Sequence, residues 1–244
     1  MKVNEYRGPD SRRVQQMFAG IAHRYDFLNH FLSASIDRRW RKTAVAKVHD
    51  LIRASSSTTC LDVCSGTGDL AIALHRSTGN TVIAADFCHP MLTRATAKVA
   101  AAGMKASVLN VEADSLDLPF GDRSFDAVTI AFGLRNLESP VRGLTEIHRL
   151  LRPGGAAVIL EFSRPVVPIF RNIFAFYFRY ILPHLGAAIS GDATAYQYLP
   201  DSVARFPTQK ELVEVMRSAG FLNVGYRNLS GGIAALHWGV KQFG

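Results

Sequence analysis

The sequence predicts a doubly wound α/β fold built on a mostly parallel sheet. Residues 60–63 are a short apolar run that is followed by a glycine-rich turn and then by apolar residues at helical spacing, which is a strand–loop–helix unit. Further apolar runs alternate with helical patterns up to residue 162. Strands separated by helices pair in parallel through right-handed crossovers. At 244 residues, 48% of them hydrophobic, the chain can bury such a sheet.

Helices are expected to precede the sheet. Val14, Phe18 and Ile21 recur at three- and four-residue steps behind Ser11, a residue type that caps helices. A further amphipathic helix is expected over residues 38–52. Its apolar face would carry Trp40, Ala44, Val48 and Leu51.

Strands and helices then alternate through residues 54–244, which we expect to form the main domain behind a helical cap of residues 1–53. The helix that ends near residue 151 is expected to be closed by the turn formers Pro153, Gly154 and Gly155. The last two strands are expected to form an antiparallel hairpin, which completes a seven-stranded sheet. Strands are expected at residues 60–63, 81–86, 107–112, 125–132, 156–162, 223–228 and 233–240, and helices at residues 69–76, 90–102, 140–151 and 208–218.

Residues 164–206 interrupt this alternation as an apolar insertion rich in Phe and Tyr. Arg171 and Arg179 break its apolar run well short of the ~20 residues that a membrane-spanning helix needs. We expect the insertion to close over an apolar pocket or to lie on a membrane surface. Ordinary packing in the core is the alternative.

The loop Gly66-Thr67-Gly68 is typical of nucleotide-binding turns, in which glycine lets a ligand approach the main chain. Its spacing also fits a dinucleotide site. Asp69, at the start of the helix, would repel a pyrophosphate and suit a positively charged ligand, as would Asp62. S-adenosylmethionine (AdoMet) has a sulfonium, an ammonium and a ribose but no phosphate, so the acids favour it, with Asp86 accepting the ribose hydroxyls. A dinucleotide, and an Asp69 that only caps its helix, remain the alternatives.

The net charge of +8 permits an anionic partner, but the basic residues form separate clusters and no contiguous stripe. Nucleic acid is therefore not expected, whereas peripheral contact with an anionic membrane stays open. The three cysteines lack metal-ligand spacing, so we expect no metal, and they fit a reducing compartment. Residues 1–13 are too polar for a signal peptide. We expect a cytoplasmic protein, with any membrane contact at the inner face of the cytoplasmic membrane.

Separated motifs make the chain similar to one enzyme family. They are Tyr-Asp-Phe-Leu-Asn at 25–29, Leu-Asp-Val-Cys-Ser-Gly-Thr-Gly-Asp-Leu at 61–70, Phe-Gly-Leu-Arg-Asn-Leu at 132–137 and Arg-Leu-Leu-Arg-Pro-Gly-Gly at 149–155, with Tyr-Gln-Tyr-Leu at 196–199. From about Gln15 to Lys241 the chain resembles the UbiE/MenG group of class I AdoMet-dependent methyltransferases, the C-methyltransferases of ubiquinone and menaquinone biosynthesis. Ser65 and Ala131 depart from the family pattern without removing the glycine turn.

The resemblance implies which residues hold the cofactor. Thr67 would contact the methionine part of AdoMet, and Asp86 would hold the ribose. Asp114 and Ser115 would bracket the adenine, although an Asp114 that only caps its own loop is the alternative. Asp62, Gly66 and Gly68 complete the expected cofactor-binding set.

The resemblance also implies a catalytic group in the segment after the fourth strand. Arg135 would stabilise a phenolate or orient a water that takes the proton, and Asn136 would fix that water or the quinol oxygen. A salt bridge and a turn residue are the respective alternatives. Tyr25 and Asp26 would close the pocket. Three histidines are further candidate bases, although a lone histidine is more often structural: His23, His148 and His237.

The implied reaction is methyl transfer from AdoMet to a ring carbon of a polyprenylated quinol. The favoured conversion is demethylmenaquinol to menaquinol, with the benzoquinol of the ubiquinone pathway as a further acceptor. Three alternatives stay open: another small-molecule or RNA acceptor on the same fold, a non-catalytic AdoMet-binding assembly subunit, and an NAD-dependent dehydrogenase. A homodimer is the oligomeric state left open.

Overall fold

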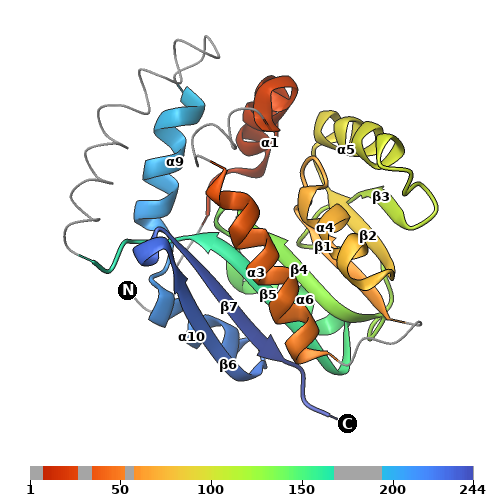
Figure 1. Cartoon of the computed structure of the whole chain (residues 1–244). Helices are drawn as coiled ribbons and strands as arrows, with labels where there is room; N and C mark the ends of the chain where they lie inside the picture. Colours follow the sequence, from red (N-terminus) through yellow and green to blue (C-terminus); the bar gives the residue numbers. More distant parts are fainter. Residues whose placement is uncertain (1–7, 27–34, 53–57, 168–193, 244) are drawn as a thin grey trace.

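A seven-stranded sheet forms the centre of the protein (Figure 1). The computed structural model describes residues 8–26, 35–52, 58–167 and 194–243. The strand order is β3-β2-β1-β4-β5-β7-β6. The first five strands are parallel, and β7 runs antiparallel to both β5 and β6, which confirms the predicted mostly parallel sheet and its final hairpin. The strands are β1 (Thr59–Val63), β2 (Thr81–Asp86), β3 (Val108–Glu112), β4 (Phe125–Ala131), β5 (Leu151–Phe162), β6 (Leu222–Leu229) and β7 (Ala234–Val240).

Helices cover both faces of the sheet, so the described part of the chain has three layers. One face packs against α3, α4 and α5, and the opposite face packs against α6 and α10. The helix α1 lies outside these layers, across the carboxyl ends of the parallel strands. The helices are α1 (Ser11–Ile21), α3 (Ile36–Leu51), α4 (Asp69–Thr78), α5 (His89–Ala101), α6 (Pro140–Leu150), α9 (Thr194–Arg205) and α10 (Gln209–Ser218), with the short 3-10 turns η2 (Ala22–Arg24), η3 (Leu134–Asn136) and η5 (Ser230–Gly232).

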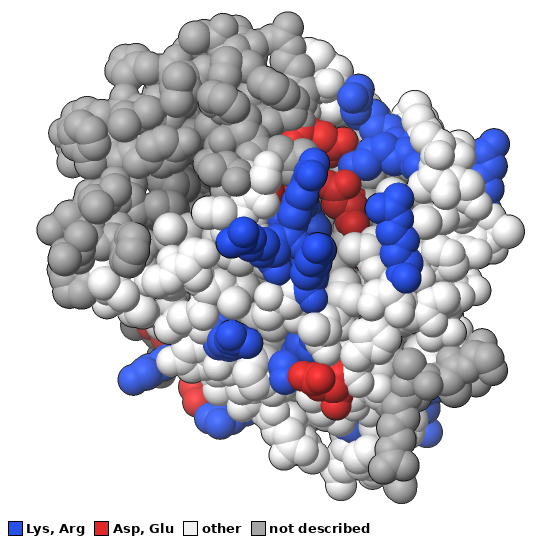
Figure 2. All heavy atoms as spheres, viewed as in Figure 1, with Lys and Arg blue, Asp and Glu red and all other residues white. Residues whose placement is uncertain are grey.

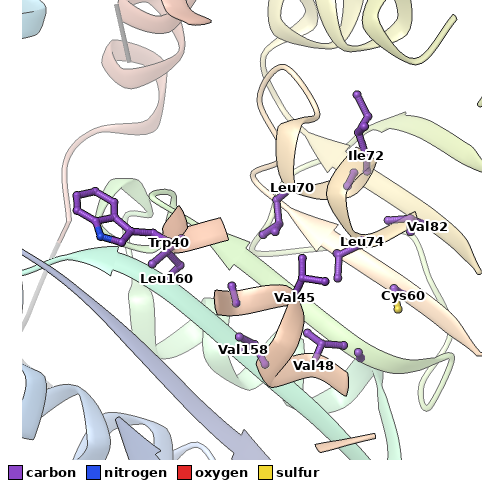
Figure 3. Packing of buried hydrophobic residues seen from close by; sticks show 14 of the residues in the cluster. Trp40, Val45, Val48, Cys60, Leu70, Ile72, Leu74, Val82, Val158 and Leu160 are labelled. Carbon is purple, nitrogen blue, oxygen red and sulfur yellow. The ribbon is translucent and has the colours of Figure 1, made fainter. Parts of the chain in front are cut away.

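The alternating side chains of the central strands build the two cores. On β5, Val158 and Leu160 face the α3 side, whereas Ala157 and Ile159 face the α6 side. Figure 3 shows the first of these cores, in which side chains of α3 and α4 meet those of the sheet. Full burial of a Leu or Val side chain contributes about 1.5–3 kcal/mol, so these rows fix the register of the sheet.

The predicted N-terminal helices are confirmed, with one correction. The cap of α1 is Asp10, whose Oδ1 accepts a hydrogen bond from the backbone N–H of Arg13 at 2.9 Å. Ser11 is already helical, and its N–H donates to Glu138 Oε1 at 3.0 Å. An N-cap residue needs an extended backbone, which Asp10 has and Ser11 lacks.

The predicted turn at Pro153, Gly154 and Gly155 is wrong, because β5 begins at Leu151 and runs through all three residues. The strand is held there by Gly154 N–H, which donates to Lys241 O at 3.0 Å, and by Lys241 N–H, which donates to Gly155 O at 2.9 Å. Gly154 has a φ of +79°, and the pairing register with β4 shifts next to it. The glycines therefore permit an irregularity inside the strand and do not end it.

Most of the apolar insertion, residues 168–193, lies outside the described residues, and so do Arg171 and Arg179. Its last part forms α9, which includes Pro200 within the helix. None of the helices in the described ranges is both long and apolar enough to cross a bilayer. The division into a cap of residues 1–53 and a domain of residues 54–244 stays a prediction.

Candidate active site

A pocket lies at the carboxyl ends of the parallel strands, where β1 and β4 meet and the strand order reverses. Open α/β sheets bind their ligands at this position. Loops after four strands contribute to its wall, and α1 with Tyr25 covers it. Its lining includes Cys64 and Gly66 after β1, Asp86 to Cys88 at the end of β2, Asp114 to Leu116 after β3, and Ala131 to Gly133 with Asn136 at and after the end of β4.

The glycine loop takes the predicted conformation. Gly66 and Gly68 have φ values of +55° and +82°, which favour glycine. A Cβ on Gly68 would come within 3.3 Å of the Cβ of Ala95 on α5, so a side chain there would also press on the neighbouring helix. The loop brings Gly66 into the pocket wall, with the ring of Tyr25 opposite it.

Asp86 joins this loop to the end of β2. Its Oδ2 accepts from the N–H of Gly66 and its Oδ1 from the N–H of Cys88, both at 2.8 Å. Burial raises the pKa of the Asp86 carboxyl, while these backbone donors act to lower it. The carboxylate is thus held in place at the pocket wall, as a ribose-binding residue must be, and that role stays a prediction.

Thr67 belongs to a polar network beside the pocket, and its side chain makes contacts within the protein. Its hydroxyl donates to Asp26 Oδ1 at 2.5 Å, and it accepts from Lys98 Nζ at 3.1 Å. Lys98 Nζ also donates to Asp26 Oδ2 at 3.0 Å and to Asp69 Oδ1. This network, the Lys98 cluster, ties the segment after η2 to the glycine loop and to α5. It positions Tyr25, the neighbour of Asp26 in the chain.

Asp69 does not offer the pocket the free negative charge that the sequence predicted. Its carboxylate pairs with Lys98 and lies 3.6 Å from Arg41 Nη2, so two cations of the chain balance its charge and it does not face the pocket as a free anion. Asp69 is not the cap of α4 either, because the N-cap is Gly68 and no side chain caps that helix. The folding of α3 and α5 against the loop brings these cations together, which no local pattern around Asp69 reveals.

Asp62 is buried within β1. Its Oδ1 accepts from the Thr129 hydroxyl at 2.7 Å, and its Oδ2 has no hydrogen-bond partner among the described residues. Burial raises the pKa of this carboxyl to about 7, against the lowering effect of Thr129 and of Arg41. Asp62 does not line the pocket in the described structure, and its cofactor role stays a prediction.

Asp114 and Ser115 both line the pocket. Asp114 Oδ1 accepts from the N–H of Leu116 at 2.9 Å, so the residue caps its own loop, as the alternative interpretation has it, and still faces the pocket. Ser115 is buried, with its Oγ 3.2 Å from the sulfur of Cys64. Burial raises the pKa of the Cys64 thiol, so this cysteine stays protonated, in keeping with an inert thiol.

Arg135 and Asn136 occupy η3, the turn after β4, but they point to different surroundings. Arg135 is only 5% exposed and does not line the pocket. Its Nη1 donates to Glu161 Oε1 at 2.6 Å, and its Nε lies 3.4 Å from the Ser202 hydroxyl of α9. Asn136 does line the pocket. The salt bridge expected as the alternative for Arg135 is therefore present, and its catalytic role stays a prediction.

Phe132 organises this turn through an unusual backbone conformation. Its φ is +59°, which costs a non-glycine residue about 1–2 kcal/mol. The conformation turns its carbonyl oxygen toward Arg135 Nη1, at 2.5 Å, and Asn136 Nδ2, at 3.2 Å. Its ring packs on that of Phe162 with a centroid distance of 4.6 Å, and Trp40 packs on both. An aromatic wall thus adjoins the polar turn.

The candidate histidine bases do not reach the pocket within the described structure. His237 is buried on β7, its Nε2 lies 3.0 Å from Gln209 O, and burial lowers its pKa to about 4. His148 packs against Phe221 at the far end of α6, and His23 is exposed on η2. In the described ranges no group of three or more His, Cys, Asp or Glu side chains is arranged to hold a metal ion.

The sequence matches the ubiE/COQ5 methyltransferase family over residues 6–241. The chain belongs to this family. A demethylmenaquinone methyltransferase from Thermus thermophilus is 47% identical over 226 residues, which are 92% of this chain and 100% of that protein. Another from Deinococcus radiodurans is 45% identical over 94% of this chain and 92% of its own. A ubiquinone/menaquinone biosynthesis C-methyltransferase UbiE from Geobacter sulfurreducens is 43% identical over 98% of this chain and 93% of its own.

Solved structures of low identity share the fold of this methyltransferase. The cyclase SpnF superposes with a TM-score of 0.72 at 18% identity, over 98% of this chain and 99% of its own. A SAM-dependent methyltransferase from Aquifex aeolicus superposes with a TM-score of 0.56 at 19% identity, over 80% of this chain and 88% of its own. The class I methyltransferase fold is confirmed, and the protein is an AdoMet-dependent methyltransferase with AdoMet as its methyl donor.

Sequence reasoning missed three residues of the site region. Glu161 had a signal, because it is the one carboxylate in the otherwise apolar run of residues 156–162 and such a charge needs a partner. Tyr198 lies in a motif of the family resemblance but had no assigned role. Lys98 had no signal, because its partners Asp26, Thr67 and Asp69 are distant in the sequence.

Proposed function

We propose that this methyltransferase transfers the methyl group of AdoMet to a ring carbon of a polyprenylated quinol, with demethylmenaquinol as the favoured acceptor and the ubiquinone-pathway benzoquinol as a second one. The relatives named above are demethylmenaquinone and quinone-pathway C-methyltransferases that match nearly the whole chain. The main support from the structure is that a single pocket is lined both by Gly66 and Asp86 and by Phe132 and Asn136. A cofactor and an acceptor can therefore lie side by side in it.

The residues of the pocket fit AdoMet. Three carboxylates line it, those of Asp86, Asp114 and Glu138, whereas no Lys, Arg or His stands among the described lining residues. This distribution favours a phosphate-free, positively charged cofactor over a dinucleotide. Gly66 offers close approach to the main chain, and Val14 and Phe18 of α1 supply an apolar cover. When bound, AdoMet supplies an electrophilic methyl group on a positively charged sulfur.

Asn136 is the residue of the β4 turn best placed to act on the acceptor. A quinol ring carbon becomes nucleophilic when a ring hydroxyl ionises, and such a hydroxyl has a pKa of about 10 outside a protein, like tyrosine. An N–H of Asn136 Nδ2 can donate to the quinolate oxygen and favour the ionised form. Donation to Phe132 O occupies only one of the two N–H groups of this nitrogen.

Arg135 contributes little charge to the ionisation of the quinol, because it is paired with Glu161. Glu161 lies 2.6 Å from its Nη1, so the pair is nearly neutral and its field at the pocket is small. The guanidinium also donates to Phe132 O and to the Ser202 hydroxyl, so its described contacts stay within the protein. Phe132, Phe162 and Trp40 screen the reacting groups from water on one side. Tyr25 covers the cofactor side.

The proposed reaction is tested by methyl transfer from labelled AdoMet to chemically reduced demethylmenaquinone in detergent, beside a reduced demethylated ubiquinone precursor. Product from the naphthoquinol alone makes the protein a menaquinone enzyme, and product from both makes it dual-purpose. AdoMet binding without product from either acceptor would overturn the quinol assignment. That outcome leaves another small-molecule acceptor or a non-catalytic assembly subunit.

Binding of the cofactor can be measured without any acceptor. AdoMet, and not NAD, should raise the melting temperature of the protein, because a ligand that binds only the folded state stabilises it by mass action.

A basic surface on α3 supports the proposal that the enzyme meets its quinol at the inner face of the cytoplasmic membrane. Arg38, Arg39 and Lys42 are exposed there, next to Ile36, which is 38% exposed. Figure 2 shows Lys and Arg side chains gathered over this part of the molecule. Anionic vesicles should bind the protein, and 0.5 M salt should weaken binding, because surface charges are screened over a few ångströms at that ionic strength. Absent or salt-independent binding would contradict the membrane contact.

Sedimentation of the purified protein tests whether it forms a homodimer.

A further inference from the structure

Helix α9 contributes a hydrogen bond to Asn136, and the residue that donates it has no role in the reaction described so far. The Tyr198 hydroxyl donates to Asn136 Oδ1 at 2.8 Å. One turn further along the helix, the Ser202 hydroxyl accepts from Arg135 Nε at 3.4 Å. Helix α9, labelled in Figure 1, packs against η3, so Arg135 and Asn136 are both held from the same helix.

The surroundings of Asn136 determine which end of its amide faces which partner. Phe132 O is a carbonyl oxygen and can only accept, so the group 3.2 Å from it must be the NH₂ of Asn136. The oxygen of the amide then faces Tyr198, and Tyr198 must be the donor in that contact. Phe132 and Tyr198 therefore hold the two ends of the amide in one orientation.

This orientation matters for the reaction in the proposed function. A quinolate oxygen needs a donor, and only the NH₂ end of Asn136 can supply one. If the amide rotated by 180° about its last side-chain bond, it would present its oxygen to the acceptor and repel the anion. Tyr198 opposes that rotation because its hydroxyl holds the carbonyl end of the amide.

We propose that Tyr198 is a positioning residue for methyl transfer, which acts through Asn136 by holding the amide so that its Nδ2 faces the acceptor oxygen. The inference rests on the proposed quinol methyltransferase function and deepens it. It makes α9, which directly follows residues 168–193 of the apolar insertion, a part of the reaction centre and not only of its cover.

The test compares Tyr198→Phe with the wild-type enzyme in the reduced demethylmenaquinone assay. A positioning error near the reacting atoms can cost as much as about 100-fold in rate, so we expect kcat to fall by about 10-fold or more. The dissociation constant for AdoMet should stay close to the wild-type value, because Tyr198 contacts a residue at the acceptor end of the pocket. The melting temperature should also stay close to that of the wild type, because the substitution removes only a hydroxyl group. Tyr226→Phe is the matched control, since it removes the same hydroxyl from β6, where the ring stacks on His237, and it should leave kcat unchanged.

A double-mutant cycle separates positioning through Asn136 from a general structural role. Asn136→Ala should lower kcat at least as much as Tyr198→Phe does, and adding Tyr198→Phe to Asn136→Ala should lower it no further. A Tyr198→Phe enzyme with wild-type kcat, or one that loses the same factor in both backgrounds, would overturn the inference. Wild-type enzyme that methylates neither quinol would instead overturn the proposed function on which the inference rests.

Discussion

The two ends of the pocket are built by different means. At the cofactor end, backbone groups form the wall of the pocket. The glycine turn takes its conformation from Gly66 and Gly68, and two backbone N–H groups hold the Asp86 carboxylate. At the acceptor end, side chains from distant segments meet: Arg135 meets Glu161, and Asn136 meets Tyr198. At the wall of the pocket, the cofactor end therefore depends mainly on backbone groups, and the acceptor end on contacts between side chains of distant segments.

The buried ion pair should show this difference most strongly. Glu161→Ala leaves Arg135 buried without its partner, and breaking such a pair costs about 3–5 kcal/mol of unfolding free energy. Urea unfolding measures the change. Glu214→Ala is the control, because its pair with Arg217 is more than half exposed and should contribute less than about 1 kcal/mol. Equal losses in the two variants would mean that Arg135 finds another partner and that the acceptor end is not held by this pair.

Asp62 offers a pH test beside the cofactor end. Its folded-state pKa of about 7 lies above the ordinary value of 3.8, so between these values the folded protein binds more protons than the unfolded chain. Stability from this group is therefore lost as the pH rises from about 4 to about 7, and it is constant above that range.

Asp62→Asn removes that dependence, since the amide does not ionise. The unfolding free energy of the variant relative to wild type should rise across this pH range by on the order of 2–4 kcal/mol, at about 1.4 kcal/mol per pKa unit. Denaturant unfolding at pH 4.5, 6 and 8 measures it, with the exposed Asp117→Asn as control. A difference that does not change with pH would show that Asp62 is ionised throughout in the fold.

Asp86 tests whether the cofactor end separates from the acceptor end. Asp86→Asn replaces one acceptor oxygen of a charged group by a donor, which should raise the dissociation constant for AdoMet by about 10–100-fold, because hydrogen bonds to charged groups contribute about 1.5–3 kcal/mol. Titration calorimetry measures it. Glu112→Gln alters an exposed carboxylate beside His89 and should bind normally. A variant with normal affinity and a reduced kcat would place Asp86 in the acceptor chemistry instead.

The Lys98 cluster lies at the cofactor end, and its removal should have the smallest effect. Lys98 is 29% exposed, so Lys98→Met should cost about 1 kcal/mol of stability. It should also raise the KM for AdoMet a few-fold, because Asp26 loses an anchor beside Tyr25. Lys105→Met, in an exposed turn, is the control. If Lys98→Met changed stability but left the KM untouched, the cluster would be structural only.

Much of the fold followed from local patterns. The period of two in strands and of 3.6 in helices placed most helix ends and every described strand within a few residues, except for the start of β5, and glycines marked the first loop. The prediction failed at Pro153 to Gly155, where turn-forming residues lie inside β5. There, pairing with the chain near Lys241 outweighs local preference, and no residue next to that turn reveals it.

For the site, the sequence alone determined the family, the glycine turn and the set of polar residues near the strand ends. The tertiary structure decided how their charges are used. It paired Asp69 with Lys98 and Arg41, it placed Asp62 away from the pocket wall, and it turned Arg135 toward Glu161. The physical reason is that backbone conformation is governed by neighbouring residues, whereas the partner of a charge is whichever side chain the packed helices and strands bring within a few ångströms.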